Sequence, residues 1–347
     1  MSESAELLAI AGRLAAAAGL PAPVALDRLE GGRNNRVFRV ILQSGELVVL
    51  KSYYRDLRDD RDRLGAEWAF TRFAWDHGIR EIPRPLAADL DSNCGLYSYV
   101  QGRKLAAGAV DEAKIEAAVR FVEKLNADPG SIASLAPASE ACFTIARHLA
   151  TIEGRVARLD GIDAAAPYRR EAEDFVSKQL KPVWTAVRAA VLRDCARLGL
   201  SADDALGADE RCASPSDFGF HNALVDGAGR VTFLDFEYAG QDDPAKLIAD
   251  FFCQPEIPVP FRCFDRFADA VMSALGLGSP HRERARLLLD AYRVKWLCIM
   301  LNDFVPGDAA RRAFSARDAW ATRCADRLAQ AAAAIELIGT AADSSPL

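Results

Sequence analysis

The sequence predicts an α+β, two-lobed protein: a small β-rich N-terminal lobe and a larger, mostly helical C-terminal lobe with an embedded β-hairpin. Three observations lead to this fold class. Short strand-like runs surround one helix before Gly102. From Asp111 onward, the apolar residues mostly recur at helical spacing. A single β-like stretch, residues 222–236, interrupts those helices.

Local patterns predict the elements of the N-terminal lobe. The Leu- and Ala-rich residues 5–18 predict a helix ending near Gly19, and a second helix follows the charged run 55–63 and stops at Gly78. Turn residues and prolines separate the extended segments from one another. Strands are predicted over 24–29, 37–42, 47–51, 86–88 and 96–100.

The C-terminal lobe is predicted from longer periodic segments. Its helices are expected over 111–126, 139–158, 167–198, 261–275, 282–302 and 309–339. A chain of 347 residues is long enough for two lobes. We expect the boundary at Gln101-Gly102, which gives an N-terminal lobe of residues 1–101 and a C-terminal lobe of residues 102–347.

Composition argues against several functional classes. The chain has 43 basic and 49 acidic residues, a net charge of −6, so nucleic acid is not expected as the main partner. It contains no apolar run long enough to span a membrane, and residues 2–6 do not resemble a signal peptide. Its eight scattered cysteines form no metal-binding or disulfide pattern and fit reduced thiols, so we expect a cytoplasmic protein.

The segment from Ser214 to Glu237 carries the most chemical information. It places Asp217 in a loop, Asn222 at the start of a strand, and Asp235 at the end of the return strand. Phosphoryl transfer needs a carboxylate that orients the acceptor hydroxyl and oxygen ligands that hold Mg²⁺ against the phosphates. A hairpin that brings Asn222 and Asp235 together beneath Asp217 would supply both.

This segment resembles the aminoglycoside phosphotransferase and choline kinase superfamily, which consists of small-molecule kinases with a protein-kinase-like fold. The family loop reads H-G-D-x-x-x-x-N, followed by a hairpin and a D-W/F-E/D segment. The resemblance implies that Asp217 is the catalytic carboxylate and that Asn222 and Asp235 bind Mg²⁺. The string Asp217-Phe218-Gly219 is not the D-F-G motif of protein kinases, because residues 181–216 contain no Asn for an upstream loop.

The loop departs from the family pattern at three positions. Pro215 stands where the family usually has His, and Ser216 stands where Gly is usual. His221, directly before Asn222, is also atypical. We expect it either to approach substrate or phosphate, or to bond to the loop backbone.

The resemblance also implies a nucleotide site in the N-terminal lobe. Lys51 matches the Lys that holds the α- and β-phosphates of ATP, and Glu67 is the candidate partner that orients it. The loop between the first two strands is expected to cover the phosphates, and the hinge is expected to meet adenine through its backbone. The residues implied are Gly31, Gly32 and Asn34 in the loop, and Ser98 and Val100 in the hinge.

The sequence thus predicts an ATP- and Mg²⁺-dependent phosphotransferase that acts on a hydroxyl of a small molecule. An aminoglycoside, an amino alcohol or a sugar-like acceptor all remain open, since no motif in the helical lobe decides between them. A nucleotide-binding pseudoenzyme with a regulatory or scaffolding role is the alternative. A protein kinase is disfavoured, because Asp243-Pro244 follows Asp235 too closely for an activation loop.

Overall fold

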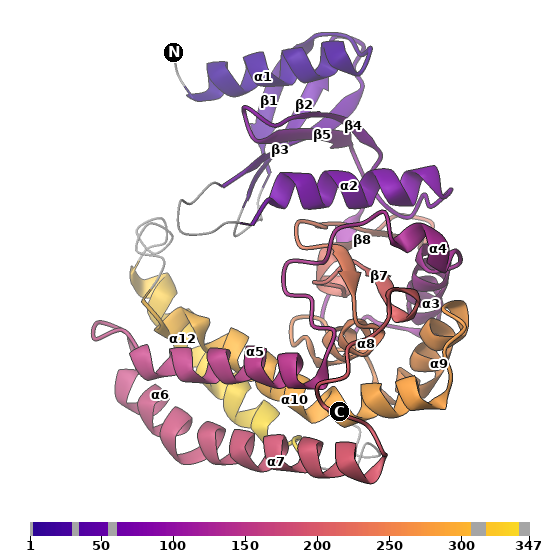
Figure 1. Cartoon of the computed structure of the whole chain (residues 1–347). Coiled ribbons are helices and arrows are strands. Elements are labelled where there is room, and N and C mark those ends of the chain that lie inside the picture. Colours follow the sequence, from indigo (N-terminus) through magenta and orange to yellow (C-terminus); the bar gives the residue numbers. More distant parts are fainter. Residues whose placement is uncertain (1–2, 30–34, 55–60, 307–316, 340–347) are drawn as a thin grey trace. The chain divides into compact units, whose positions relative to one another are not determined.

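The computed structural model describes residues 3–29, 35–54, 61–306 and 317–339. The chain divides into two compact units (Figure 1). The first contains residues 1–141 and 211–242, and the second contains residues 142–210 and 243–347. The expected boundary at 101/102 falls inside the first unit, and that division into lobes stays a prediction.

The first unit is built on a five-stranded antiparallel sheet with the order β1-β2-β3-β5-β4. Two further small sheets, β6-β8-β9 and β10-β7, lie in the same unit. Its strands are β1 (Pro23–Arg28), β2 (Asn35–Leu42), β3 (Leu47–Tyr53), β4 (Pro85–Asp89), β5 (Cys94–Ser98), β6 (Arg103–Lys104), β7 (Cys212–Ser214), β8 (Ala223–Val225), β9 (Val231–Phe233) and β10 (Gly240–Asp242). Its helices are α1 (Glu3–Ala17), α2 (Arg63–Asp76), α3 (Glu112–Leu125) and α4 (Pro129–Ile132).

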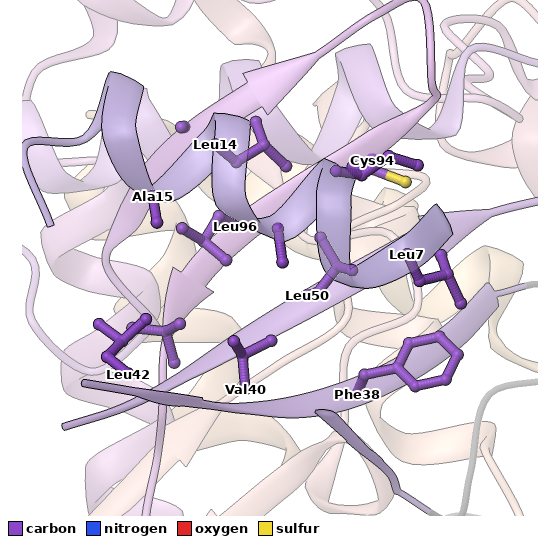
Figure 2. Packing of buried hydrophobic residues seen from close by; sticks show 13 residues of the cluster. Leu7, Leu14, Ala15, Phe38, Val40, Leu42, Leu50, Cys94 and Leu96 are labelled. Atoms are coloured by element: carbon purple, nitrogen blue, oxygen red, sulfur yellow. The ribbon is translucent and has the colours of Figure 1, made fainter. Parts of the chain in front are cut away.

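Helices α1 and α2 lie on opposite faces of the large sheet (Figure 1). Figure 2 shows the apolar side chains of α1, including Leu7 and Leu14, packed on Val40, Leu50 and Leu96 of the strands. Side chains alternate between the two faces of a strand. Because Leu50 points toward α1, the neighbouring Lys51 points to the face that α2 covers.

The second unit is helical among its described residues. Helix α10 is its central element and contacts α5, α7, α8, α9 and α12. The helices are α5 (Ile145–Arg158), α6 (Arg169–Phe175), α7 (Lys181–Arg197), α8 (Pro244–Cys253), α9 (Phe264–Ala274), α10 (Ser279–Met300) and α12 (Arg317–Ile335). A π-helical turn, Val176–Leu180, joins α6 to α7. No helix among the described residues is both long enough and apolar enough to cross a membrane.

These elements confirm the predicted fold class, with two local corrections. The helix expected from residue 139 begins at Ile145, after the N-cap Thr144. The residues before it instead bond to the returning chain, since Ala138 N donates to Gln241 O at 2.9 Å and Ser139 N donates to Tyr238 O at 3.1 Å. The expected strand at 96–100 runs from Cys94 to Ser98.

Candidate functional site

A buried ion-pair network forms around Lys51 at the centre of the first unit. Its Nζ lies 2.6 and 2.9 Å from the two carboxylate oxygens of Glu67 and 2.8 Å from Oδ1 of Asp235. Lys51 and Glu67 are both buried, while Asp235 is about one-third exposed. Burial lowers the pKa of Lys51, but the carboxylates of Asp235 and Glu67 outweigh this effect and raise it. The ammonium group therefore stays charged.

The local sequence explains how three distant residues meet at this point. Lys51 projects from β3 toward α2, whose first turn is capped when Asp62 accepts a hydrogen bond from Gly65 N. Phe70, on the same helix as Glu67, stacks on Phe236 with a centroid distance of 5.1 Å. Because Phe236 follows Asp235, this packing holds the Asp235 segment against the helix that carries Glu67.

Two tyrosines extend the network behind Glu67. The Tyr53 hydroxyl donates to Oε2 of Glu67 at 2.8 Å and lies 3.1 Å from the Tyr97 hydroxyl. Burial, and then the neighbouring Glu67 carboxylate, raise the pKa of Tyr53, so its hydroxyl keeps the proton that it donates. Tyr53 was not among the residues predicted from the sequence. The alternation of side chains along β3 could have indicated it, because residues 51 and 53 share a face of the strand.

Asn35 is a second residue that the sequence analysis did not select. It begins β2, and its Nδ2 donates to Oε2 of Glu237 at 3.1 Å and to Oδ1 of Asp235 at 3.4 Å. Glu237 also lies 3.9 Å from Nε of Arg63, and all of Asn35, Arg63 and Glu237 are buried. The start of β2 is therefore tied to the Asp235 segment. Gly31, Gly32 and Asn34 lie outside the described residues.

Asp217 and Asn222 lie together in the loop before β8. The Asn222 Nδ2 donates to Oδ2 of Asp217 at 3.2 Å and to its backbone oxygen at 3.0 Å. His221 Nε2 lies 3.2 Å from Oδ1 of the same carboxylate. The Asp217 side chain is 38% exposed, so it can reach a bound acceptor.

Aromatic side chains anchor this loop. Phe218 and Phe220 are buried and pack on Phe233 of β9, with centroid distances of 5.0 and 6.2 Å. Phe121 of α3 stacks on Phe233 at 4.6 Å. The loop thus alternates apolar anchors with the polar residues Asp217 and His221, which leaves those polar groups directed away from the core.

The backbone is strained at two positions of this region. Asp235 has φ +68° and Ser216 has φ +66°, in the left-handed region that favours glycine. Such strain costs about 1–3 kcal/mol per residue and is typical of functional sites. The positive φ of Ser216 explains why glycine suits the position before the loop carboxylate.

The donor set fits a magnesium ion. Leu234 N donates to Asn222 O at 2.8 Å, which places Asp235 beside Asn222 across the hairpin. Among the described residues, the contacts of Asn222 use its Nδ2 and those of Asp235 use Oδ1, so Oδ1 of Asn222 and Oδ2 of Asp235 are available to a metal ion. Among the described residues, no group of three or more His, Cys, Asp or Glu forms a metal site. Mg²⁺ usually takes one or two protein ligands together with phosphate oxygens, so Asn222 and Asp235 are enough protein ligands for it.

The hinge residues lie at the end of β5. Ser98 N donates to Arg84 O at 2.9 Å, and Ser98 Oγ accepts from Arg84 N at 2.8 Å. Since its N–H is already used, the backbone of Ser98 can offer adenine its carbonyl but not its amide. Val100 follows the end of β5. No further contact ties either residue to the Lys51 network, so their role in nucleotide binding stays a prediction.

Two acidic residues downstream of Asp235 have structural roles. Asp243 caps α8 by accepting from Ala245 N at 2.7 Å, with Pro244 at the first helical position. Asp250 is buried and lies 2.7 Å from Lys295 Nζ. Lys295 is therefore paired in the interior of the second unit rather than offered to an anionic substrate.

Comparison with known proteins identifies the family. A model of the phosphotransferase enzyme family matches residues 25–288. Comparison with curated protein sequences gave no match.

Solved structures with a similar fold cover almost the whole chain. A spectinomycin phosphotransferase in complex with ADP and spectinomycin has a TM-score of 0.58 at 11% identity, covering 96% of this chain and 98% of that one. A choline/ethanolamine kinase family protein from Mesorhizobium loti has a TM-score of 0.53 at 20% identity, covering 96% and 99%. Choline kinase LicA from Streptococcus pneumoniae has a TM-score of 0.55 at 14% identity, covering 95% and 100%.

These similarities show that the fold is the protein-kinase-like fold of small-molecule phosphotransferases. The family match spans most of the chain and includes both Lys51 and the segment from Asp217 to Asp235. The chain therefore belongs to the phosphotransferase enzyme family.

Proposed function

We propose that the protein transfers the γ-phosphoryl group of ATP to a hydroxyl of a small molecule, with Mg²⁺ as the metal. The observation that carries the proposal is the position of Lys51, whose Nζ contacts both Glu67 and Asp235 within 2.9 Å. A cation held in this way is available to phosphate oxygens, and it lies directly beside a carboxylate suited to a metal.

In this proposal each residue has a distinct role. Asp217 orients the acceptor hydroxyl and takes its proton as the new oxygen–phosphorus bond forms. The bond between the γ-phosphorus and the bridging oxygen breaks, and ADP leaves. Lys51, fixed by Glu67, binds phosphate oxygens of ATP. Asn222 and Asp235 hold Mg²⁺, which neutralises charge on the phosphates when it is bound.

Nucleotide use is supported by the similar spectinomycin phosphotransferase, whose structure contains ADP. The similar proteins act on an aminocyclitol antibiotic or are named as choline and ethanolamine kinases. We therefore propose amine-bearing alcohols and aminoglycosides as the first acceptor classes to examine, with sugars as the third.

The test is release of ADP from Mg-ATP across a panel of aminoglycosides, choline, ethanolamine, homoserine and sugars. Release that depends on one acceptor is expected to fall at least about 100-fold in Asp217→Asn, because proton transfer contributes that much or more to such reactions. Asp235→Asn should also nearly abolish turnover. Asp226→Asn is the matched control, since Asp226 lies in the same hairpin and its contacts are local: it accepts from Ala228 N and Arg230 N and pairs with Nε of Arg230 at 2.7 Å.

The outcomes separate the alternatives. Acceptor-dependent release that is lost in Asp217→Asn and retained in Asp226→Asn supports the proposal. Mg-ATP binding without release with any acceptor would favour a nucleotide-binding pseudoenzyme. Full activity of Asp235→Asn would refute the assigned site.

A further inference from the structure

His221 contacts the loop carboxylate in a way that the proposed reaction does not yet use. Its Nε2 lies 3.2 Å from Oδ1 of Asp217, and the side chain is only 14% exposed. The other oxygen, Oδ2, accepts from Asn222 Nδ2, also at 3.2 Å. The carboxylate of Asp217 is thus held at both oxygens by two consecutive residues of its own loop.

The second ring nitrogen of His221 shows which proton arrangement this contact requires. Nδ1 is buried and has no hydrogen-bond partner among the described residues. A proton on Nδ1 would leave a buried donor unsatisfied, and it would also turn the lone pair of Nε2 toward a carboxylate oxygen. The neutral ring with its proton on Nε2 avoids both penalties. In that form Nε2–H donates to Asp217.

We propose that His221 is a positioning residue that fixes the carboxylate plane of Asp217 by donating from Nε2, a role that rests on the function proposed above. Loss of this bond removes a restraint on Oδ1 and lets the carboxylate of Asp217 rotate more freely about the last side-chain bond. A carboxylate that must meet an acceptor hydroxyl loses rate when its orientation is not fixed. The contribution is therefore to turnover rather than to nucleotide binding.

The surrounding chain supports this role. His221 sits between Phe220, which is fully buried, and Asn222, whose backbone oxygen accepts from Leu234 N just after β9, so its backbone is anchored on both sides. Upstream of Asp217, Pro215 offers no side-chain donor. His221 and Asn222, from the same loop, each restrain one oxygen of the carboxylate.

The chain offers a matched control in its second unit. His281 Nε2 lies 3.0 Å from Oε1 of Glu210, its side chain is 17% exposed, and its Nδ1 is also buried without a partner among the described residues. His281→Phe and His221→Phe therefore remove the same kind of bond. Only the second touches the candidate site.

The experiment compares His221→Phe, His221→Gln and His281→Phe in the full-length chain, with steady-state kinetics and thermal unfolding for each. His221→Phe should lower kcat roughly tenfold and leave KM for ATP unchanged. His221→Gln, whose amide N–H can occupy the position of Nε2–H, should recover most of the loss. His281→Phe should lower thermal stability by a similar amount to His221→Phe and leave kcat unchanged.

Long-range ¹H–¹⁵N NMR of the histidine-labelled protein gives a readout that does not depend on activity. The chain has four histidines, and the signal that disappears in His221→Phe identifies the ring. A proton on Nε2 is expected, and a proton on Nδ1 would overturn the proposal. Failure of the proposed function is recognised separately, because either the wild type would release no ADP with any acceptor or Asp217→Asn would stay fully active. A loss of activity in Asp217→Asn together with unchanged kcat in His221→Phe refutes only the role of His221.

Discussion

Deleting the Tyr53 hydroxyl tests whether the tyrosines behind Glu67 stabilise the ion-pair network. Tyr53→Phe removes one donor to Oε2 of Glu67, at 2.8 Å, and leaves the two contacts of Lys51 with that carboxylate. A hydrogen bond to a charged group contributes about 1.5–3 kcal/mol. We therefore expect the first unit to lose about 2 kcal/mol of stability.

Tyr97→Phe is the matched control for this change. It removes only the contact between two neutral hydroxyls, at 3.1 Å, while Tyr53 still donates to Glu67. A neutral hydrogen bond contributes about 1 kcal/mol, half of the effect expected for Tyr53→Phe. Both tyrosines are buried in the same network, so Tyr53→Phe is expected to lose more stability than Tyr97→Phe.

Hydrogen exchange followed by mass spectrometry reads this effect within the first unit. The peptide that covers Leu47–Tyr53 should exchange about 30-fold faster in Tyr53→Phe, which corresponds to 2 kcal/mol, and about fivefold faster in Tyr97→Phe. A larger effect in Tyr97→Phe than in Tyr53→Phe would refute the reasoning. So would unchanged exchange in Tyr53→Phe.

Three further predictions concern the same structure. Lys51→Met should destabilise the first unit by about 3–5 kcal/mol, because the buried carboxylate of Glu67 loses its counter-ion; chemical denaturation checks this. The same variant should raise KM for ATP, which kinetics at low ATP checks. Burial lowers the pKa of His148, but its hydrogen bond to Asp243 outweighs burial and raises the pKa. Protonated His148 therefore stabilises the folded state fully below about pH 6.5, and this contribution is lost as the pH rises through the raised folded-state pKa. Unfolding free energies at about pH 6 and pH 9 should therefore differ less in His148→Gln than in the wild type. Gly240→Ala should lower the free energy of unfolding by about 3 kcal/mol or more, because a Cβ there would overlap the backbone carbonyl of Ala136. Gly227→Ala is the control and should leave stability unchanged, since nothing lies close to a Cβ at that position.

The sequence predicted those parts of the fold that rest on local pattern. The alternation in residues 37–42 and 47–51 predicted β2 and β3, and the stop at Gly78 agrees with its φ of +78°. The three-residue strands β7 and β10 were not predicted. They pair with each other across the hairpin that follows Asp217, β10 also bridges Pro137, and three residues carry no readable period.

The candidate site could be predicted where a motif fixed both residue type and spacing. Lys51, Glu67, Asp217, Asn222 and Asp235 were all named from the sequence, and the contacts among them follow from the hairpin and from β3. Asn35 and Tyr53 could not be predicted as site residues in the same way. Their partners lie 200 and 14 positions away, and nothing in the local sequence distinguishes a buried Asn or Tyr from an exposed one.

The division of the first unit into two chain segments has a consequence for how the protein is made. A ribosome that has completed residue 141 has produced the large sheet and α3, but not β7–β10 or the loop with Asp217. The missing segment, 211–242, is complete only after residues 142–242 have been added, a delay of about 5–20 s at ordinary elongation rates. Until then Phe121 lacks Phe233, and Lys51 has Glu67 without Asp235. The nascent chain therefore exposes this apolar surface during the delay, and the candidate site can form only after residue 242 has been added.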